Sequence, residues 1–304
     1  MKVKFDNSDF CIVNYADGKY TKGQERLKES LVKNGYKGDF LFFSEIDKNL
    51  FPPQNESPWG FKPIAIKYAI EKGYKYILWL DSNMICIRNP KKIFKKIISN
   101  GYYISSVFTT FMGEWCSDIT LEKLGISRDL SLKIQEVDAG YFGINSSSKV
   151  TLDLLNEWCA FAKDGLTFRG IDKSLDWTLG YKNENFIVSK DIRVKGHRHD
   201  QTVLSYLVWK YKLSPSYFET KSIHKTVNGK STYSKGVSLH VEIVRNRDIK
   251  KENDDYLKNY NKFGNKKGLS KIVFFIISCL DTIKRQKRYK HILLQRKNET
   301  NDLH

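Results

Sequence analysis

The stretch ILWLDSNMI, residues 77–85, indicates the fold class of this sequence. Four apolar residues run without interruption into Asp81, and an amide, Asn83, follows two positions later. An unbroken apolar run of this length is typical of a strand that helices cover on both faces of a sheet. The stretch therefore predicts a central strand that ends on a carboxylate.

The segments around this strand alternate between two kinds of pattern. Short apolar runs predict strands, and apolar residues at helical spacing before a glycine predict helices. The strand-like runs cover residues 9–15, 39–45, 75–81 and 102–108, and the helix-like segments cover 24–35, 60–73 and 89–101. The order β-α-β-α-β-α-β predicts an α/β fold with a mainly parallel central sheet flanked by helices. In such sheets ligands bind outside the carboxyl ends of the strands, where Asp81 is expected.

Composition is that of a large globular domain. The chain has 304 residues, of which 40% are hydrophobic, and no period of about 20–50 residues repeats along it. Its five cysteines are scattered, odd in number and without a CxxC pair, which predicts buried reduced thiols rather than a disulfide framework or a zinc site. The first residues lack the apolar stretch of a secretory signal, so we expect a cytoplasmic protein.

The net charge of +18 is concentrated near the end of the chain. Residues 262–297 contain eleven lysines and arginines and one acidic residue, Asp281. We therefore divide the chain into a domain at 1–261 and a basic tail at 262–304.

The tail combines this charge with a short apolar segment. Its apolar core, residues 272–280, would span about 14 Å as a helix, half of the ~30 Å that a membrane requires. We expect an amphipathic helix on an anionic membrane surface, which makes the protein peripheral on the cytosolic face of a membrane. The alternative is a helix packed on the domain, followed by a disordered basic end.

Three motifs follow one another along about 130 residues. They are LWLDSNM around Asp81, EVDAGYFGINSSSKV at 136–150 and HRHDQTVLSYLVWKY at 197–211. In their order and spacing they resemble GT-A-fold nucleotide-sugar glycosyltransferases, in particular glycogenin and the bacterial lipopolysaccharide glycosyltransferases. LWLDSNM resembles the DxD motif, whose acids hold Mn²⁺ or Mg²⁺ against the donor diphosphate. The resemblance covers roughly residues 9–245.

This resemblance implies roles for individual residues. The catalytic candidates, beside the anomeric carbon or the sugar hydroxyls, are Asp200, Gln201 and Asp138. Metal ligands would be Asp81, Asn83 and His240, with His224 competing for the place of His240. Donor contacts would come from strand ends and helix starts, namely Tyr15, Ala16, Asp17, Lys62, Asp81, Ser82, Asn83, Ala139, Gly140, Arg198 and His199.

Asn83 departs from the family pattern, since an amide binds a hard cation more weakly than a carboxylate. Three outcomes follow. A weak Mn²⁺ or Mg²⁺ site is retained, cations such as Lys62 or Arg198 replace the metal, or the protein is an inactive sugar-binding relative. We favour the retained site.

Several of these candidate site residues could instead have a purely structural role. Asp200 is suited to cap the helix that follows it, and Asp138 to cap a turn. His197 and His199 flank Arg198 in a polar run that is more typical of an anionic pocket than of a zinc site. The weakly periodic segment 163–186 is either an acceptor loop or a surface connection.

The tryptophans divide into two groups. Trp115 and Trp177 lie in polar loops and are candidates for stacking on a sugar. The others follow apolar patterns that predict core positions, namely Trp59, Trp79, Trp158 and Trp209.

The function expected from this resemblance is transfer of a sugar from a nucleotide-sugar to a glycan or glycolipid acceptor, with retention of configuration. The rival from another class is a basic nucleic-acid-binding protein. Against it, half of the net charge lies in a tail that is also apolar, and no nucleic-acid-binding motif appears. We therefore expect no nucleic-acid partner.

Overall fold

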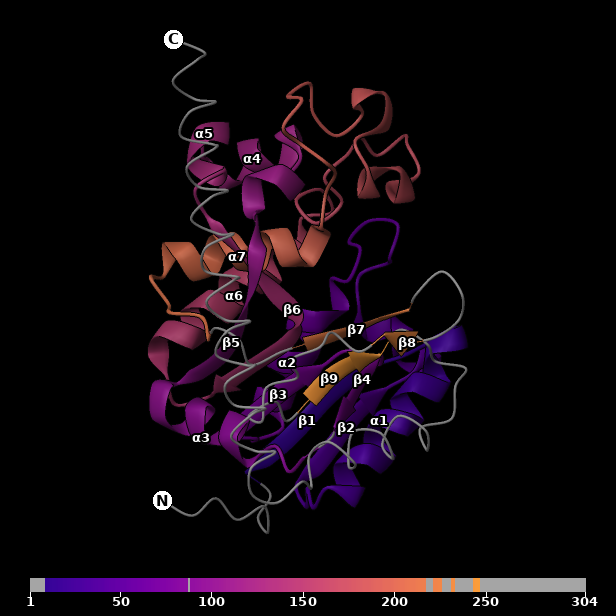
Figure 1. Ribbon diagram of the computed structural model, residues 1–304, viewed down its shortest axis with the longest axis vertical. Helices are drawn as coiled ribbons and strands as arrows, with labels where there is room; N and C mark the ends of the chain where they lie inside the picture. The colour runs from indigo at the N-terminus through magenta and orange to yellow at the C-terminus, as the bar shows by residue number, and fades with distance from the viewer. Residues whose placement is uncertain (1–8, 87, 217–220, 226–230, 233–242, 247–304) are drawn as a thin grey trace.

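The computed structural model describes residues 9–86, 88–216, 221–225, 231–232 and 243–246 (Figure 1). His240, Cys279 and the basic tail lie outside these residues.

The main sheet has five strands in the order β2-β1-β3-β6-β5. Its members are β1 (Phe10–Tyr15), β2 (Asp39–Phe43), β3 (Tyr76–Leu80), β5 (Tyr102–Phe111) and β6 (Gln135–Asn145). β1 pairs in parallel with both β2 and β3, whereas β6 is antiparallel to β3 and to β5. β6 is thus the one reversed strand of this sheet, and the α/β class with a mainly parallel sheet is confirmed.

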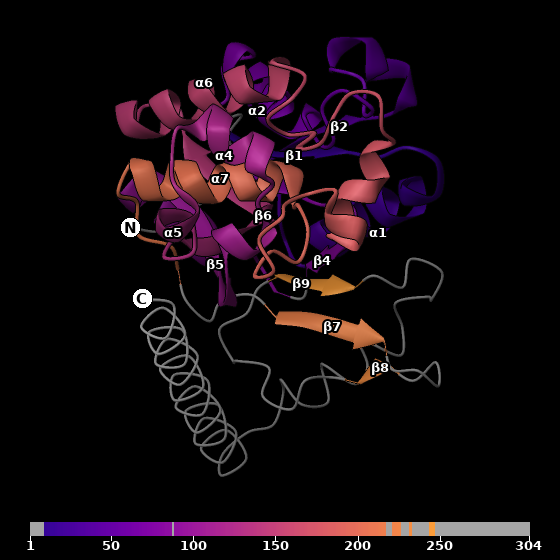
Figure 2. The same cartoon turned by 90° about the horizontal axis from the view of Figure 1, so that it is seen from above.

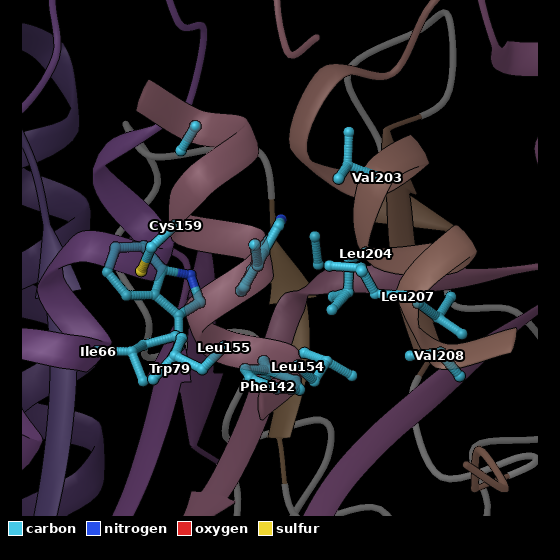
Figure 3. Close-up of a cluster of buried hydrophobic side chains, with 14 of the residues drawn as sticks. Ile66, Trp79, Phe142, Leu154, Leu155, Cys159, Val203, Leu204, Leu207 and Val208 are labelled. Carbon is cyan, nitrogen blue, oxygen red and sulfur yellow. The ribbon is translucent and has the colours of Figure 1, made fainter. Parts of the chain in front are cut away.

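Helices cover both faces of the main sheet (Figure 2). On one face lie α2 (Phe61–Glu71), α6 (Lys149–Lys163) and α7 (His199–Lys210), and on the other α1 (Thr21–Lys33) and α3 (Lys91–Asn100). The two-residue period of the strands supplies both cores: Ile77 and Trp79 pack with α2, α6 and α7, while Leu78 and Leu80 pack with α1 and α3. Figure 3 shows side chains of α6 and α7 gathered against the sheet in the first core.

The chain leaves β3 at Asp81 and enters a second, smaller sheet. This sheet has the order β4-β9-β7-β8, with β4 (Met84–Cys86), β7 (Lys221–Lys225), β8 (Ser231–Thr232) and β9 (Ile243–Asn246). The three side chains of β4 are buried, which explains why the sequence turns apolar again after Asn83. Asp81 therefore lies at the junction of two sheets.

The connections beyond the carboxyl ends of the strands form the region around the site. η1 (Gly18–Tyr20) follows β1, and η2 (Glu45–Leu50) follows β2. η3 (Met112–Trp115), α4 (Asp118–Leu124) and α5 (Arg128–Ser131) join β5 to β6, and the segment 164–198, with η4 (Trp177–Tyr181) and η5 (Glu184–Phe186), joins α6 to α7. In Figure 1 this last segment (salmon) lies beyond the loop that precedes α2.

Two further expectations concern the chain as a whole. Cys11, Cys86, Cys116 and Cys159 are buried thiols outside any disulfide, as the cysteine pattern predicts. Within the part of the chain that the structure describes, no helix has the length and apolar character needed to cross a membrane.

Candidate functional site

Asp81 follows β3 and is oriented by hydrogen bonds from its backbone to β6 and from Trp79 to its side chain. Its backbone N–H donates to the carbonyl oxygen of Gly140 in β6 at 3.0 Å, and the indole Nε1 of Trp79 donates to its Oδ1 at 2.9 Å. Its side chain remains 23% exposed. The carboxylate that ends the apolar strand is therefore both oriented and accessible to a ligand.

Lys62 lies in the first turn of α2 and is the centre of the site. Its side chain is 5% exposed, and Nζ lies 3.0 Å from Oδ1 of Asp81 and 2.8 Å from Oδ2 of Asp200. Nζ also donates to the carbonyl oxygen of Ala139 at 3.4 Å. Burial would lower the pKa of this ammonium, but Asp200 and Asp81 together raise it above its usual value. Lys62 is thus a buried cation that its two carboxylate partners stabilise.

Asp200 enters the site from the first turn of α7. Arg198 is the residue before this helix, and no side chain there accepts a capping hydrogen bond, so the interpretation of Asp200 as the N-cap is wrong. The Asp200 side chain instead reaches Lys62. Burial raises the pKa of this carboxyl to about 6, although Lys62 opposes the rise. Asp200 is therefore partly protonated in mildly acidic solution.

Asp138 lies on β6, directly before Ala139. Its carboxylate is buried, and Oδ1 accepts from the backbone N–H of Gly140 at 2.8 Å. The same strand thus supplies Asp138, the carbonyl oxygen that Lys62 contacts, and the carbonyl oxygen that holds Asp81. Asp81 and Asp200, which lie far apart in the sequence, thus meet at Lys62, and the strand that carries Asp138 supplies a backbone contact to each of Lys62 and Asp81.

The loop after β1 borders this region. Tyr15 packs its ring against Phe61 with centroids 4.6 Å apart, and its hydroxyl donates to Oδ2 of Asp17 at 3.3 Å. The backbone N–H of Ala16 donates to Phe43 at the end of β2. Ser82 Oγ donates to the carbonyl oxygen of Tyr15 at 3.1 Å, which ties this loop to the end of β3.

Asn14 is a structural link that sequence reasoning missed. This buried amide donates to the carbonyl oxygen of Leu80 at 2.5 Å and accepts from Nε2 of Gln24 at 2.8 Å. Gly23 allows α1 to approach the same point, because a Cβ there would lie 2.5 Å from the carbonyl oxygen of Ser82. A polar residue in an otherwise apolar strand was the signal that could have identified Asn14.

The residues around Asp81 fit a divalent cation in part. The side-chain oxygen of Asn83 is buried and, among the described residues, has no hydrogen-bond partner, so an oxygen-seeking cation would satisfy it. Two aspartates, Asp81 and Asp200, against one ammonium also leave the site with excess negative charge. Within the described residues, no group of three or more His, Cys, Asp or Glu is placed to hold a metal. His240, the third predicted ligand, lies outside those residues.

Arg198 and Gln201 belong to a second polar cluster. The Arg198 guanidinium pairs with the buried carboxylate of Glu136 and stacks on Trp115, with its central carbon 3.9 Å from the ring centroid. Thr110 and Gln201 hydrogen-bond the same carboxylate. The expectation that Arg198 serves as a substitute for the metal is not supported by this pairing. Glu136, two positions before Asp138 on β6, was missed by sequence reasoning.

The two histidines that flank Arg198 are buried instead of lining an anionic pocket. His197 lies under Gly170, where a Cβ would come within 2.2 Å of its ring. His199 packs among the rings of Trp59, Trp177 and Tyr181, and burial lowers its pKa to about 4. A neutral, covered imidazole is a poor partner for a donor phosphate, so the predicted donor contact of His199 is not supported.

The tryptophans only partly follow their expected division. Trp79 and Trp158 are in the core as predicted. Trp209 is 43% exposed, which makes its predicted core position wrong. Trp59 is half-buried and Trp177 contacts it, with ring centroids 5.5 Å apart.

Comparisons with known proteins give structural likenesses alone. No family model matches the sequence, and no curated protein matches it. Mouse xyloside xylosyltransferase 1 is similar over 78% of this chain and 97% of its own, at 12% identity and a TM-score of 0.43. The bifunctional glycosyltransferase WbbM aligns over 79% of this chain and 46% of its own, at 9% identity and a TM-score of 0.44.

A third solved structure is the galactosyltransferase LgtC in complex with donor and acceptor sugar analogues. It aligns over 87% of this chain and 99% of its own, at 14% identity and a TM-score of 0.38. All three are glycosyltransferases, the class that the sequence motifs resemble. At TM-scores below 0.5 these likenesses identify neither a family nor an activity for this chain, so the residues of the site must carry the functional inference.

Proposed function

We propose that this protein is a GT-A-type glycosyltransferase that moves a sugar from a nucleotide-sugar donor to a glycan or glycolipid acceptor. The observation that supports this proposal best is the buried Lys62 ammonium between Asp81 and Asp200, at the carboxyl ends of the strands. Burying charged side chains costs free energy of folding. A group of buried charges with one partly exposed member is therefore typical of a functional site.

The charge of this group favours an anionic ligand that arrives with a cation. The aspartates outnumber the ammonium, so a bare diphosphate would be repelled. Asp81 and the unpartnered oxygen of Asn83 would hold Mn²⁺ or Mg²⁺, with a third ligand such as His240. The metal would neutralise negative charge on the departing nucleoside diphosphate. Lys62 would then lie beside the same diphosphate as a second, fixed cation.

Asp138 and Asp200 would contact the transferred sugar. Both carboxylates are buried and able to accept hydrogen bonds from its hydroxyl groups. Gln201 bonds Glu136, which places its side chain in the neighbouring cluster, so we assign Gln201 a positioning role. We also propose that the transfer keeps the configuration at the anomeric carbon. In such a mechanism the leaving phosphate guides the acceptor hydroxyl, and no protein carboxylate serves as the base.

The basic tail, residues 262–304, indicates where in the cell this transfer would take place. Residues 262–297 combine an apolar segment with eleven basic residues, a composition suited to an anionic membrane surface. A peripheral position at the cytosolic face would bring the domain to glycolipid acceptors. Deleting residues 262–304 would then move the protein from the membrane fraction to the soluble fraction.

The proposed activity is tested by nucleotide release. We expect slow hydrolysis of at least one nucleotide-sugar in a panel with Mn²⁺, measured as free UDP or GDP, and loss of this release in Asp81→Ala. The control is Asp153→Ala, which removes an exposed carboxylate paired with Lys149. Absence of release across the panel would contradict the enzyme and favour the inactive sugar-binding relative.

A further inference from the structure

A set of aromatic rings lies beside the Lys62 centre and is unused by the proposed donor site. Trp59 precedes α2, Trp177 and Tyr181 belong to η4, and His199 begins α7. The centroid of the His199 ring lies 5.1 Å from that of Trp59, 5.7 Å from that of Trp177 and 5.3 Å from that of Tyr181. We call these four residues the aromatic cluster.

The imidazole of His199 presents an unsatisfied acceptor in this cluster. Its Nδ1 lies 2.8 Å from the carbonyl oxygen of Phe168, which can accept but not donate. Nδ1 therefore carries the proton, and Nε2 carries a bare lone pair. Nε2 is buried and has no hydrogen-bond partner among the described residues, while the whole side chain of His199 is 1% exposed. A buried acceptor without a donor costs stability, so it points to a ligand that supplies one.

The aromatic cluster is joined to the proposed catalytic centre through the chain itself. His199 is the residue before Asp200, and Trp59 lies three residues before Lys62. Both have left-handed backbone conformations, with φ of 44° at His199 and 59° at Trp59, which residues with side chains adopt rarely. Backbone strain of this kind is retained where the surrounding structure requires it. A ligand on the cluster would thus lie next to the Lys62–Asp200 pair.

We propose that the aromatic cluster is the acceptor subsite and that the acceptor is a saccharide. This rests on the proposed sugar transfer and names its second substrate by chemistry. A pyranose has an apolar C–H face that packs on Trp177 and Tyr181, and hydroxyl groups of which one donates to Nε2 of His199. A lipid chain would leave Nε2 unsatisfied, and an anion would be repelled by its lone pair. Tyr181, which is 42% exposed, is the most exposed ring of the aromatic cluster, and the proposed subsite requires this ring to move to admit the hydroxyl.

Binding is tested with simple glycosides by saturation-transfer NMR. The probes are the methyl α- and β-glycosides of glucose, galactose, mannose, xylose and N-acetylglucosamine, with and without UDP and Mn²⁺. We expect at least one to bind the full-length protein, about tenfold more weakly to Trp177→Ala, and with intermediate affinity to Trp177→Phe. The matched control is Trp209→Ala, which removes an exposed tryptophan outside the aromatic cluster.

A second measurement reports on His199 directly. In protein labelled with ¹⁵N-histidine, donation of a hydroxyl to Nε2 shifts the resonance of that nitrogen, whereas a purely structural histidine keeps it unchanged. Binding of a glycoside should therefore move the Nε2 signal of His199, which is assigned from its loss in His199→Gln. The His197 signal serves as the internal reference.

The outcomes separate this proposal from the proposed function. Glycoside binding that survives Trp177→Ala, an unmoved Nε2 signal on binding, or no binding across the panel would overturn the acceptor subsite while leaving nucleotide release untouched. Glycoside binding at the aromatic cluster without nucleotide release would uphold the saccharide site and contradict transfer instead.

Discussion

Two cation–carboxylate clusters lie at the start of α7, and they differ in charge balance. In one, the Lys62 ammonium is shared by two carboxylates, those of Asp81 and Asp200. In the other, Arg198 pairs with a single carboxylate, Glu136. The first cluster has an excess of acid and the second is neutral.

This difference distinguishes a site from a structural support. The Glu136 carboxylate is fully buried and has Thr110 and Gln201 as well as Arg198 as partners, so the neutral cluster is complete in charge by itself. The Lys62 cluster is incomplete in charge and is partly open at Asp81. An incomplete buried cluster gains stability when a cation and its anion bind, whereas a complete one holds the helix in place.

The largest effect is expected for Lys62→Ala, which leaves the buried carboxylate of Asp200 and the partly buried carboxylate of Asp81 without their cation. Loss of one partner of a buried ion pair costs about 3–5 kcal/mol of unfolding free energy, measured by urea denaturation. Nucleotide release should fall by more than about a hundredfold, as for other groups that stabilise a developing charge.

The matched control for this change is Lys67→Ala. Lys67 lies on the same helix, but its ammonium makes an exposed contact with Asn156. Equal unfolding free energies of the Lys62→Ala and Lys67→Ala variants would contradict this prediction, because they would show that Asp81 and Asp200 do not depend on the Lys62 ammonium.

The next effect is the pH dependence that Asp200 imparts to stability. Its pKa is about 6 in the folded protein and about 4 when unfolded, so the folded state binds the extra proton between these values. The unfolding free energy should therefore fall as the pH rises from about 4 to about 6, by up to ~3 kcal/mol from this group.

Asp200→Asn should flatten this part of the stability profile, because the amide does not titrate. Denaturation curves at half-unit pH steps would show it. A profile that keeps its slope in Asp200→Asn would place the titration on another group.

Arg198→Met separates the two clusters. We expect a loss of roughly 2 kcal/mol in unfolding free energy, because Glu136 keeps two of its partners. Nucleotide release should stay within about threefold of the wild type, since a positioning residue does not contact the donor. If Arg198→Met reduced nucleotide release as much as Lys62→Ala does, the Arg198–Glu136 cluster would belong to the functional site and not only to its structural support.

The smallest effect is expected for Asn83→Asp, which adds a carboxylate beside Asp81. A second charged ligand should lower the Mn²⁺ concentration for half-maximal nucleotide release by about tenfold, or ~1.4 kcal/mol. An unchanged Mn²⁺ requirement would show that Asn83 is not a ligand. Release that needs no divalent metal would favour Lys62 as its replacement.

Sequence reasoning identified the Lys62 cluster because its parts follow local rules. The apolar run of β3 places Asp81 at a strand end, and the predicted segment 60–73 places Lys62 in the first turn of a helix. The Asp-Gln motif places Asp200 in the first turn of α7. Convergence of these three residues then follows from the order of strands and helices in an α/β fold.

The neutral cluster and the aromatic cluster were not predicted. The Arg198–Glu136 pair joins residues 62 positions apart, and the segment 163–186 has little periodicity from which to place its rings. Its backbone also includes residues in the left-handed conformation, such as Asn185 and Phe186, and no local sequence pattern predicts this conformation there. Contacts of this kind depend on tertiary packing, which a single sequence specifies only weakly.

The most direct test is a thermal-shift measurement with a panel of nucleotide-sugars, with and without Mn²⁺, on the wild type and Lys62→Ala. A donor present at 100 times its dissociation constant adds about 2.7 kcal/mol to the unfolding free energy. We predict that at least one nucleotide-sugar raises the melting temperature of the wild type by several degrees, more so with Mn²⁺, and leaves that of Lys62→Ala unchanged. The same shift in both proteins, or none in the wild type, would contradict a donor site built on Lys62.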